Sequence, residues 1–197
     1  MKNFTKTNNE EFEKYGFLVV RDFYDISSFI QEPPKSERGQ LLHRPSGFTE
    51  RSNDDQVPDS YSIYNDPQKR FDHSQIRLKL EKILGKKLEN TYYYERFYFD
   101  NQMLRKHVDR DACEISISIH IGTNIKTPWP FKIEDPEGKE HSLILNVGDG
   151  VVYKGRERIH WRDLIPEDTN DLNYYHQIFF HYVLSDGYFV FNPFDNK

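Results

Sequence analysis

The segment ISISIHIG, from Ile115 to Gly122, constrains the fold of this 197-residue chain more than any other. Isoleucine occupies positions 115, 117, 119 and 121, and Ser116, Ser118 and His120 stand between them. Successive side chains of a β-strand point to opposite faces, so the pattern predicts a strand with one apolar face and one face of small polar groups. The polar face either meets solvent or lines a cavity that holds a ligand.

Two helices are expected before residue 90. The first covers about residues 8–15 and leads through Gly16 into a strand at 17–20. In the second, FDHSQIRLKLEKIL, Asp72 and Gln75 are predicted to form a capping box. Its apolar face consists of Ile76, Leu80, Ile83 and Leu84, and Gly85 marks its end.

From residue 91 to 183 the sequence predicts almost only strands, with turns at 135–138, at 148–150 and at Gly155. The expected strands cover 91–99, 113–122, 129–134, 142–147, 150–154, 157–162 and 175–183. Helices followed by a run of strands predict a mainly β fold with flanking helices, in which a sandwich or barrel carries the helices on one sheet.

Residues 1–197 have the length of a single domain, with an N-terminal part at 1–90 and a β core at 91–183. Within the first part, residues 31–60 are polar and rich in proline and glycine. A loop of this length in a compact domain is usually a functional lid or a mobile segment. A lid over a bound substrate and a disordered insertion are both open.

The composition favours an aromatic-rich core or cleft, because hydrophobic residues make up only 36% of a chain that has 15 Phe, 13 Tyr and 2 Trp. A net charge of −5 argues against a nucleic-acid partner, whose phosphates bind a basic face. Cys113 is the sole cysteine, so the sequence excludes an internal disulfide and a cysteine-based zinc site. The N-terminal residues lack the apolar run of a signal peptide or membrane span, so we expect a cytoplasmic protein without membrane contact.

A histidine and a carboxylate precede the regular strand, at His107 and Asp109, where an extended backbone places both side chains on one side. This pair alone is not specific. A third residue, His160, lies in a later strand within GDGVVYKGRERIHWRD. Two histidines and a carboxylate on one face of an octahedral ion form the facial triad of non-haem Fe(II) oxygenases. These three residues are therefore predicted to bind a metal and to be catalytic; the alternative for His160 is a buried histidine satisfied by its neighbours.

Five segments follow one another in an order typical of a known family: YGFLVVRDFYD, YYYERFYFDNQMLRKHVDRDACEISISIHIG, WPFKIED, VGDGVVYKGRERIHWRD and QIFFHYV. They resemble the 2-oxoglutarate/Fe(II)-dependent oxygenases, in particular the small prolyl-hydroxylase-like members of bacteria and phages. The resemblance covers residues 90–183 and, more loosely, 11–30. It implies a double-stranded β-helix, which is a jelly-roll or cupin-like barrel, with the metal at its mouth. It also implies Fe(II) as the metal, 2-oxoglutarate as co-substrate and ascorbate as a further candidate cofactor.

The activity that this resemblance implies is that of a dioxygenase, an oxidoreductase that is usually a hydroxylase and releases succinate and carbon dioxide. The substrate is unidentified: a prolyl or other peptide and a small molecule are both open, as is the oligomeric state. The location would be the host cytoplasm if the chain is phage-encoded. In this fold the strand after His-x-Asp lines the co-substrate pocket, so the resemblance implies that Ser116 and Ser118 face that pocket and that the isoleucines pack under the helices.

Many family members hold the distal carboxylate of 2-oxoglutarate with an Arg or Lys nine to fifteen residues past the second histidine, but this chain has neither between Arg162 and Lys197. A buried dicarboxylate needs a cation or several donors. Arg162 is the first choice, because two positions past His160 on one strand it points to the same side and its guanidinium fits a carboxylate. Arg96 is the second. The other candidate pocket residues are Tyr98, Ser118, His120 and Gln177, with His181 as a further donor.

The missing anchor leaves two other interpretations open. A cupin-like barrel could bind a metal or a small ligand without turnover, and a structural or interaction module could keep the three predicted ligands apart. For each candidate anchor the alternative is a surface salt bridge or a satisfied polar group of the core. Oxygen-dependent formation of succinate from 2-oxoglutarate separates the enzyme from both.

Overall fold

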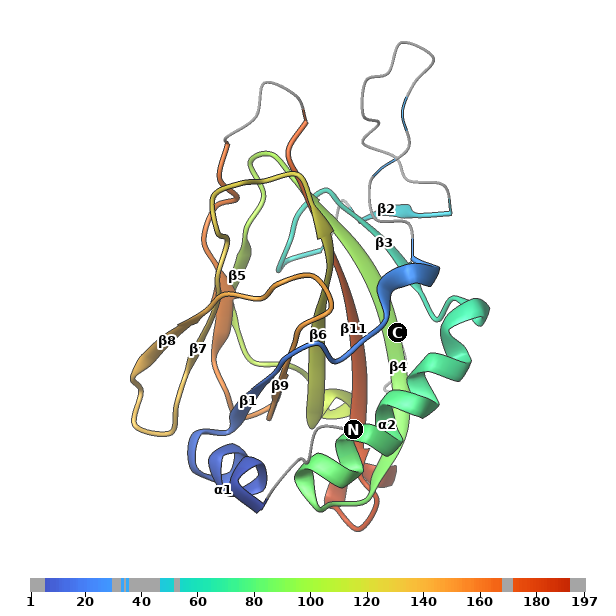
Figure 1. Ribbon diagram of the computed structural model, residues 1–197, viewed down its shortest axis with the longest axis vertical. Coiled ribbons are helices and arrows are strands. Elements are labelled where there is room, and N and C mark those ends of the chain that lie inside the picture. The colour runs from blue at the N-terminus through green and yellow to red at the C-terminus, as the bar shows by residue number, and fades with distance from the viewer. Residues whose placement is uncertain are drawn as a thin grey trace.

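The computed structural model describes residues 6–29, 33, 35, 47–51, 54–167 and 172–191. Two antiparallel sheets form the body of the molecule, as predicted for a double-stranded β-helix (Figure 1). In spatial order the larger sheet contains β1 (Phe17–Val20), β9 (Gly150–Tyr153), β6 (Ile115–Thr123), β11 (Tyr174–Leu184), β4 (Leu88–Phe99), β3 (Ser60–Tyr64) and β2 (Thr49–Arg51). The smaller sheet contains β5 (Leu104–His107), β10 (His160–Arg162), β7 (Phe131–Glu134) and β8 (Glu140–Leu143). Among these strands, no pairing joins the two sheets into a closed barrel.

Two α-helices accompany the sheets, α1 (Lys6–Tyr15) and α2 (Arg70–Leu84), and α2 lies across the outer face of the larger sheet (Figure 1). Four short 3₁₀ helices complete the described elements: η1 (Ile26–Ser28), η2 (Pro67–Lys69), η3 (Asp111–Cys113) and η4 (Tyr188–Phe191). All four isoleucines of β6 are buried in one cluster with the apolar face predicted for α2. This cluster confirms that the isoleucines pack under the helices.

The opposite face of β6 is also buried, although its residues are polar. Ser116 and Ser118 are 0% exposed and His120 is 4% exposed. Because the apolar face of the strand is covered by helices, this second face points toward the interior between the sheets. A solvent-facing serine stripe is therefore wrong for this strand.

The interior between the sheets is rich in aromatic residues, as the composition predicted. One buried cluster contains Tyr98, Trp129, Tyr175 and Phe179, and a neighbouring cluster contains Phe131 and Tyr153. Edge-to-face contacts join Trp129 to Tyr98 and to Tyr175, each with ring centroids 5.1 Å apart. Large rings with polar tips suit an interior that also holds polar groups.

The predicted start of the second helix is wrong in detail. Asp66 caps η2 by accepting a hydrogen bond from the Gln68 N–H at 3.1 Å, and α2 follows directly. Asp72 lies inside the first turn of α2, where its carboxylate accepts a hydrogen bond from the Tyr24 hydroxyl. The sequence Asp-Pro is itself a helix-start signal, because proline suits the first turn of a helix. The end at Gly85 is confirmed by its left-handed φ of 65°.

Several strand boundaries also differ from the prediction. The strand expected at 142–147 is shifted to Glu140–Leu143, because its hairpin register pairs Phe131 with Leu143. The strand expected at 157–162 is shorter and begins only at His160. Three paired strands, β2, β3 and β5, were not predicted at all.

Most of the predicted lid lies outside the described residues, including 36–46. The segment is not a continuous loop, because 49–51 form β2 and pair with β3, which begins at Ser60. Val57 is fully buried against the aromatic cluster of Tyr98. This end of the segment is therefore packed onto the body of the protein.

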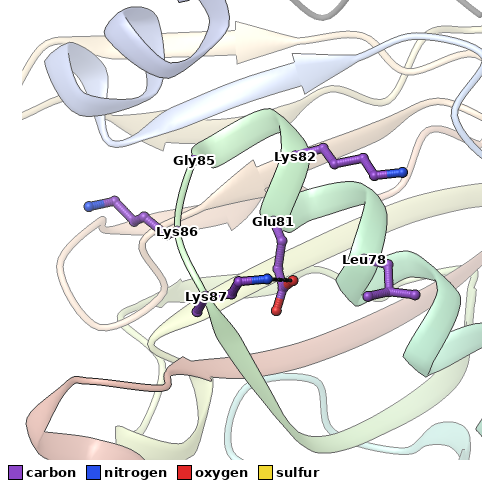
Figure 2. A pocket seen from close by; sticks show the side chains of 6 residues that line it. All are labelled: Leu78, Glu81, Lys82, Gly85, Lys86 and Lys87. Atoms are coloured by element: carbon purple, nitrogen blue, oxygen red, sulfur yellow. Dashed lines mark hydrogen bonds and ion pairs between the residues drawn. The ribbon is translucent and has the colours of Figure 1, made fainter.

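A shallow depression of about 260 Å³ lies at the C-terminal end of α2 (Figure 2). Two of its lysines are neutralised by neighbouring carboxylates: Lys87 Nζ lies 3.1 Å from Glu81 Oε2, and Lys86 Nζ lies 3.0 Å from Glu13 Oε1. Since α2 covers the outer face of the larger sheet, this depression is separated from the polar stripe of β6. In the part of the chain that the structure describes, no helix has the length and apolarity needed to cross a bilayer.

Candidate metal centre and adjoining buried arginine

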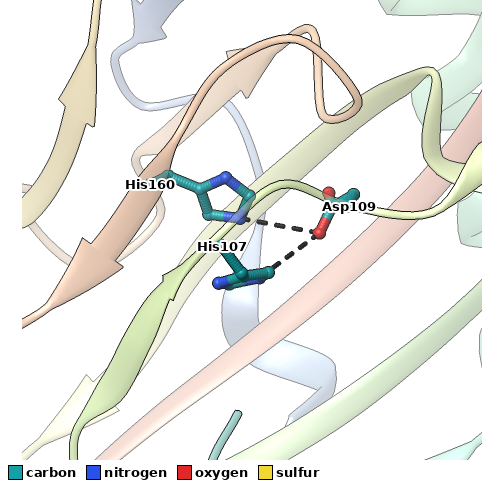
Figure 3. A group of neighbouring side chains, drawn as sticks. All are labelled: His107, Asp109 and His160. Atoms are coloured by element: carbon teal, nitrogen blue, oxygen red, sulfur yellow. Dashed lines mark ion pairs between the residues drawn. The ribbon is translucent and has the colours of Figure 1, made fainter.

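The three predicted metal ligands lie together at one end of the smaller sheet (Figure 3). His107 ends β5 and His160 begins β10, and these two residues are paired in the antiparallel register. Asp109 follows β5 by two residues, and its Oδ1 lies 3.5 Å from His107 Nε2 and 3.6 Å from His160 Nε2. Three ligand atoms from neighbouring backbone positions thus converge on one point, as a facial triad requires.

The main chain fixes the tautomer of both histidines. His107 Nδ1 lies 2.7 Å from the Arg105 carbonyl oxygen, and His160 Nδ1 lies 3.0 Å from the Arg158 carbonyl oxygen. A carbonyl oxygen can only accept, so each Nδ1 carries the proton and a neutral ring then presents an unprotonated Nε2. Such hydrogen bonds orient metal-binding imidazoles. In addition, burial lowers the pKa of His160 to about 4, so its ring is neutral at pH 7.

Asp109 is held as a carboxylate by its surroundings. Burial by itself would raise its pKa, but the His160 and His107 imidazoles beside it hold the pKa well below its usual value. Its main-chain N–H donates to the Gly155 carbonyl at 2.8 Å, which fixes the loop after β5. Ser116 Oγ donates to Asp109 Oδ2 at 3.0 Å, whereas Oδ1 faces the histidines.

A second group of ligand-type atoms adjoins the first and shares Asp109 with it. Sγ of Cys113 and a nitrogen of His181 complete this group, with all three atoms within 4.8 Å of one another. The thiol lies 3.1 Å from the Tyr92 hydroxyl, and burial raises the pKa of Cys113. His181 was predicted as a donor in the co-substrate pocket, but the structure places it at the metal end of β11.

Arg162 is buried in the interior beside the metal centre, two residues past His160 on β10. Its guanidinium carbon is 4.7 Å from the ring centres of Trp129 and Tyr175, and its Nη1 donates to the Trp129 carbonyl oxygen. The side chain is 1% exposed, yet its Nε and Nη2 have no hydrogen-bond partner among the described residues. Within those residues it also has no carboxylate partner, so its positive charge is not compensated there.

Two other predicted pocket residues have polar atoms without partners. The hydroxyl of Tyr98 and Nε2 of His120 are both buried and unpaired within the described chain. The ring of His120 stacks on Tyr175 with centroids 4.1 Å apart, and Tyr175 in turn contacts Arg162. Buried polar groups are rarely left without a partner, so these atoms indicate a polar ligand.

The remaining predicted pocket residues find most of their partners within the protein. Arg96 forms an ion pair with Asp54 through Nη2, and its Nε donates to Ser62 Oγ at 3.3 Å, although its Nη1 has no described partner. Gln177 Nε2 donates to Ser118 Oγ at 2.7 Å. Arg96 is therefore a weaker candidate anchor than Arg162, because its charge is already compensated.

Sequence reasoning missed three contributors to this region: Gly155, Trp129 and Tyr175. Gly155 was read only as a turn, but a Cβ there would lie 2.5 Å from Asp109 Oδ2. Trp129 and Tyr175 are far apart in sequence and meet only when the two sheets face each other. The alternation of aromatic residues in the predicted strands was the only available signal.

The fold defines a class: a double-stranded β-helix with a two-histidine, one-carboxylate group at the end of its smaller sheet. No protein-family model matches the sequence, and neither does a curated protein. Solved structures do match the fold. A prolyl-4-hydroxylase from Pseudomonas putida is 14% identical, with a TM-score of 0.59 over 89% of this chain and 97% of that chain.

Two further solved structures are similar over most of the chain. A prolyl hydroxylase from Trichoplax adhaerens, in complex with a hypoxia inducible factor peptide fragment, is 10% identical, with a TM-score of 0.56 over 87% of this chain and 86% of that chain. HygX from Streptomyces hygroscopicus, with nickel, 2-oxoglutarate and hygromycin B bound, is 12% identical, with a TM-score of 0.56 over 90% of this chain and 87% of that chain. The chain therefore has the double-stranded β-helix fold of the 2-oxoglutarate/Fe(II)-dependent oxygenases.

Proposed function

We propose that this protein is an Fe(II)- and 2-oxoglutarate-dependent dioxygenase that hydroxylates a substrate and releases succinate and carbon dioxide. One observation carries the proposal: the metal-facing atoms of His107, Asp109 and His160 converge, and both imidazoles present an unprotonated Nε2. Two neutral nitrogens and one carboxylate are the donor set that suits Fe(II) with open positions for a co-substrate and dioxygen. The iron would supply the oxidative decarboxylation of 2-oxoglutarate that is coupled to hydroxylation.

The buried guanidinium of Arg162 supports 2-oxoglutarate as the co-substrate. Arg162 and His160 lie two residues apart on β10, which spans about 6.6 Å along a strand and suits a five-carbon diacid with one end at the metal. The distal carboxylate would accept hydrogen bonds from Nε and Nη2 of Arg162 and from the Tyr98 hydroxyl, all of which lack a described partner. His120 would donate from Nε2 only as the other tautomer, so we assign it a lining role.

The protein would orient and shield the reaction through its own side chains. Trp129 and Tyr175 enclose the guanidinium of Arg162, so water is displaced around the distal carboxylate. Tyr92 and Tyr94 form a stacked aromatic wall with Tyr64 beside the metal end, with centroids 4.8–6.3 Å apart. We propose that the substrate, a peptide or a small molecule, lies against this wall.

An anaerobic titration tests the proposal. Fe(II) and then 2-oxoglutarate are added to the protein, and the metal-to-ligand charge-transfer absorption of the chelate is followed. We expect the band to appear, and admission of oxygen with ascorbate to yield succinate in equal amount to the carbon dioxide released. Fe(II) binding without the band would instead favour a cupin-like metal-binding protein, and absence of Fe(II) binding would contradict both.

A further inference from the structure

A buried chain of hydrogen bonds runs from the last strand of the larger sheet to the predicted carboxylate ligand. His181 Nδ1 lies 2.9 Å from Ser116 Oγ, and Ser116 Oγ lies 3.0 Å from Asp109 Oδ2. His181 is 2% exposed and Ser116 is 0% exposed, so water does not compete for these bonds. The two strands bring the residues together through the direct pairing of His181 with Ser116.

The direction of each hydrogen bond follows from the chemistry of the groups. A carboxylate can only accept, so the single hydroxyl proton of Ser116 points to Asp109. The Cys113 carbonyl oxygen is a more distant acceptor, at 3.4 Å. With its proton so engaged, Ser116 Oγ must accept from His181, which therefore carries its proton on Nδ1.

We infer that His181 and Ser116 are positioning residues that hold Asp109 as a monodentate ligand, one that binds a metal through a single carboxylate oxygen. Their chain ties up Oδ2, whereas Oδ1 remains 3.5–3.6 Å from the two histidine nitrogens. A carboxylate free to rotate can bind a metal through both oxygens and occupy a position meant for another ligand. Fixing Oδ2 would therefore keep coordination positions open. The inference rests on the proposed metal centre but not on the substrate.

The surroundings of His181 support this role over a purely space-filling one. Its ring packs against those of both Tyr92 and Tyr94, with centroids 4.6 Å and 5.7 Å away. These contacts limit rotation of the imidazole and keep Nδ1 toward Ser116. Its Nε2 has no hydrogen-bond partner in the described chain, so only the Nδ1 contact is directed. A residue kept only for packing would not need a polar atom here.

Two amide variants separate the directed hydrogen bond from packing. In His181→Asn the amide nitrogen falls near the position of Nδ1 and can donate to Ser116, whereas in His181→Gln it falls near Nε2 and cannot. Ser116→Ala removes the bridge itself. Each full-length protein is titrated with Co(II) alone, and the affinity and the visible d–d spectrum are recorded.

We expect Ser116→Ala and His181→Gln to weaken Co(II) binding by about 10–100-fold and to change the d–d spectrum, the effect typical of outer partners of metal ligands. His181→Asn should stay within about threefold of wild type. The inference is overturned if Ser116→Ala binds Co(II) like wild type with an unchanged spectrum, or if His181→Asn loses as much affinity as His181→Gln. Wild type that binds no Co(II) overturns the metal centre itself, which distinguishes that failure from failure of the chain alone.

Discussion

Asp109 and Gly155 are in direct contact across the two halves of the metal centre. The Asp109 N–H donates to the Gly155 carbonyl oxygen at 2.8 Å, and a Cβ at position 155 would lie 2.5 Å from Asp109 Oδ2. It would also lie 2.3 Å from the Cys113 carbonyl oxygen. Real Cβ atoms essentially never approach so closely, so the loop after β5 can pack on the turn before β10 only if residue 155 has no side chain.

Replacing Gly155 with alanine should therefore damage the metal centre. We expect Gly155→Ala to displace Asp109, to weaken Fe(II) binding by about 10–100-fold and to lower the free energy of unfolding by about 1–3 kcal/mol. The control is Gly138→Ala, where φ is +78° but nothing lies within 4 Å of the added Cβ. It should cost about 1 kcal/mol of stability and leave metal affinity unchanged. Equal metal affinity in both variants would contradict the role of Gly155.

Removal of a predicted metal ligand should abolish specific metal binding while the fold remains. His107 lies at the end of a strand at the edge of its sheet and is only partly buried, so His107→Ala should cost less stability than the 2–5 kcal/mol of a core truncation. We expect His107→Ala to lose far more Fe(II) affinity than a variant of any residue that only positions one of the metal-binding residues. Isothermal titration and urea unfolding give the two quantities.

A matched control for this variant is His141→Ala. His141 also lies on the smaller sheet and is partly buried, but its Nε2 pairs with Asp135 at 2.8 Å on the β7–β8 hairpin. It should bind one Fe(II) with wild-type affinity. Loss of binding in the control, or retention of it in His107→Ala, would show that the metal lies elsewhere.

The sequence predicted the elements whose signals are local. The strict alternation of β6 and the apolar face of α2 both follow from periodicity, and both were confirmed. His107, Asp109 and His160 could be singled out because their residue types match a known donor set and because the segments around them resemble a family. These predictions were possible because the periodicity and the residue types that carry them lie within a few residues of each position.

The contacts that depend on strand register could not be predicted. His181 meets Ser116 because β11 and β6 pair in one register, and a slip of one residue would turn either side chain to the other face. The ion pair of Arg96 with Asp54 joins positions 42 residues apart, through a segment that had been assigned to a loop. Only the packed structure shows that, of the two candidate anchors, Arg162 is the one without a carboxylate partner among the described residues.

Arg162 should control affinity for 2-oxoglutarate rather than for the metal. Removing one partner of a buried charge-assisted pair costs about 2–5 kcal/mol. Arg162→Ala should therefore raise the dissociation constant of 2-oxoglutarate roughly 30- to 4000-fold. Arg162→Lys should fall between, because it keeps the charge but loses the fork. The charge-transfer titration measures this constant, and Fe(II) affinity measured beside it should stay unchanged.

Arg96→Ala serves as the comparison for this prediction. Arg96 is as deeply buried as Arg162, but its charge is paired with Asp54, so its loss should affect 2-oxoglutarate less. If Arg96→Ala weakens 2-oxoglutarate binding more than Arg162→Ala does, the order of the two anchors is reversed, although the proposed activity stands.

The last prediction concerns stability at low pH and uses a histidine outside the metal centre. His73 lies on α2, is 3% exposed and donates from Nε2 to the His181 carbonyl oxygen at 3.1 Å. Burial lowers the pKa of His73 from 6.5 to about 4. Between these values the unfolded chain takes up a proton that the folded protein does not, so the stabilising contribution is complete above pH 6.5 and is lost as the pH falls toward 4.

For this one group, a decrease from pH 7 to pH 5 should lower the free energy of unfolding by about 2 kcal/mol. The variant His73→Gln does not titrate, and its amide can still donate to the His181 carbonyl oxygen, so it should lose about 2 kcal/mol less than wild type over that range. Urea unfolding of both proteins at the two pH values, with EDTA present to remove metal, measures the difference. Equal losses of stability in the two proteins would mean that His73 has the same pKa in the folded and unfolded states, because such a group contributes no pH dependence to the free energy of unfolding.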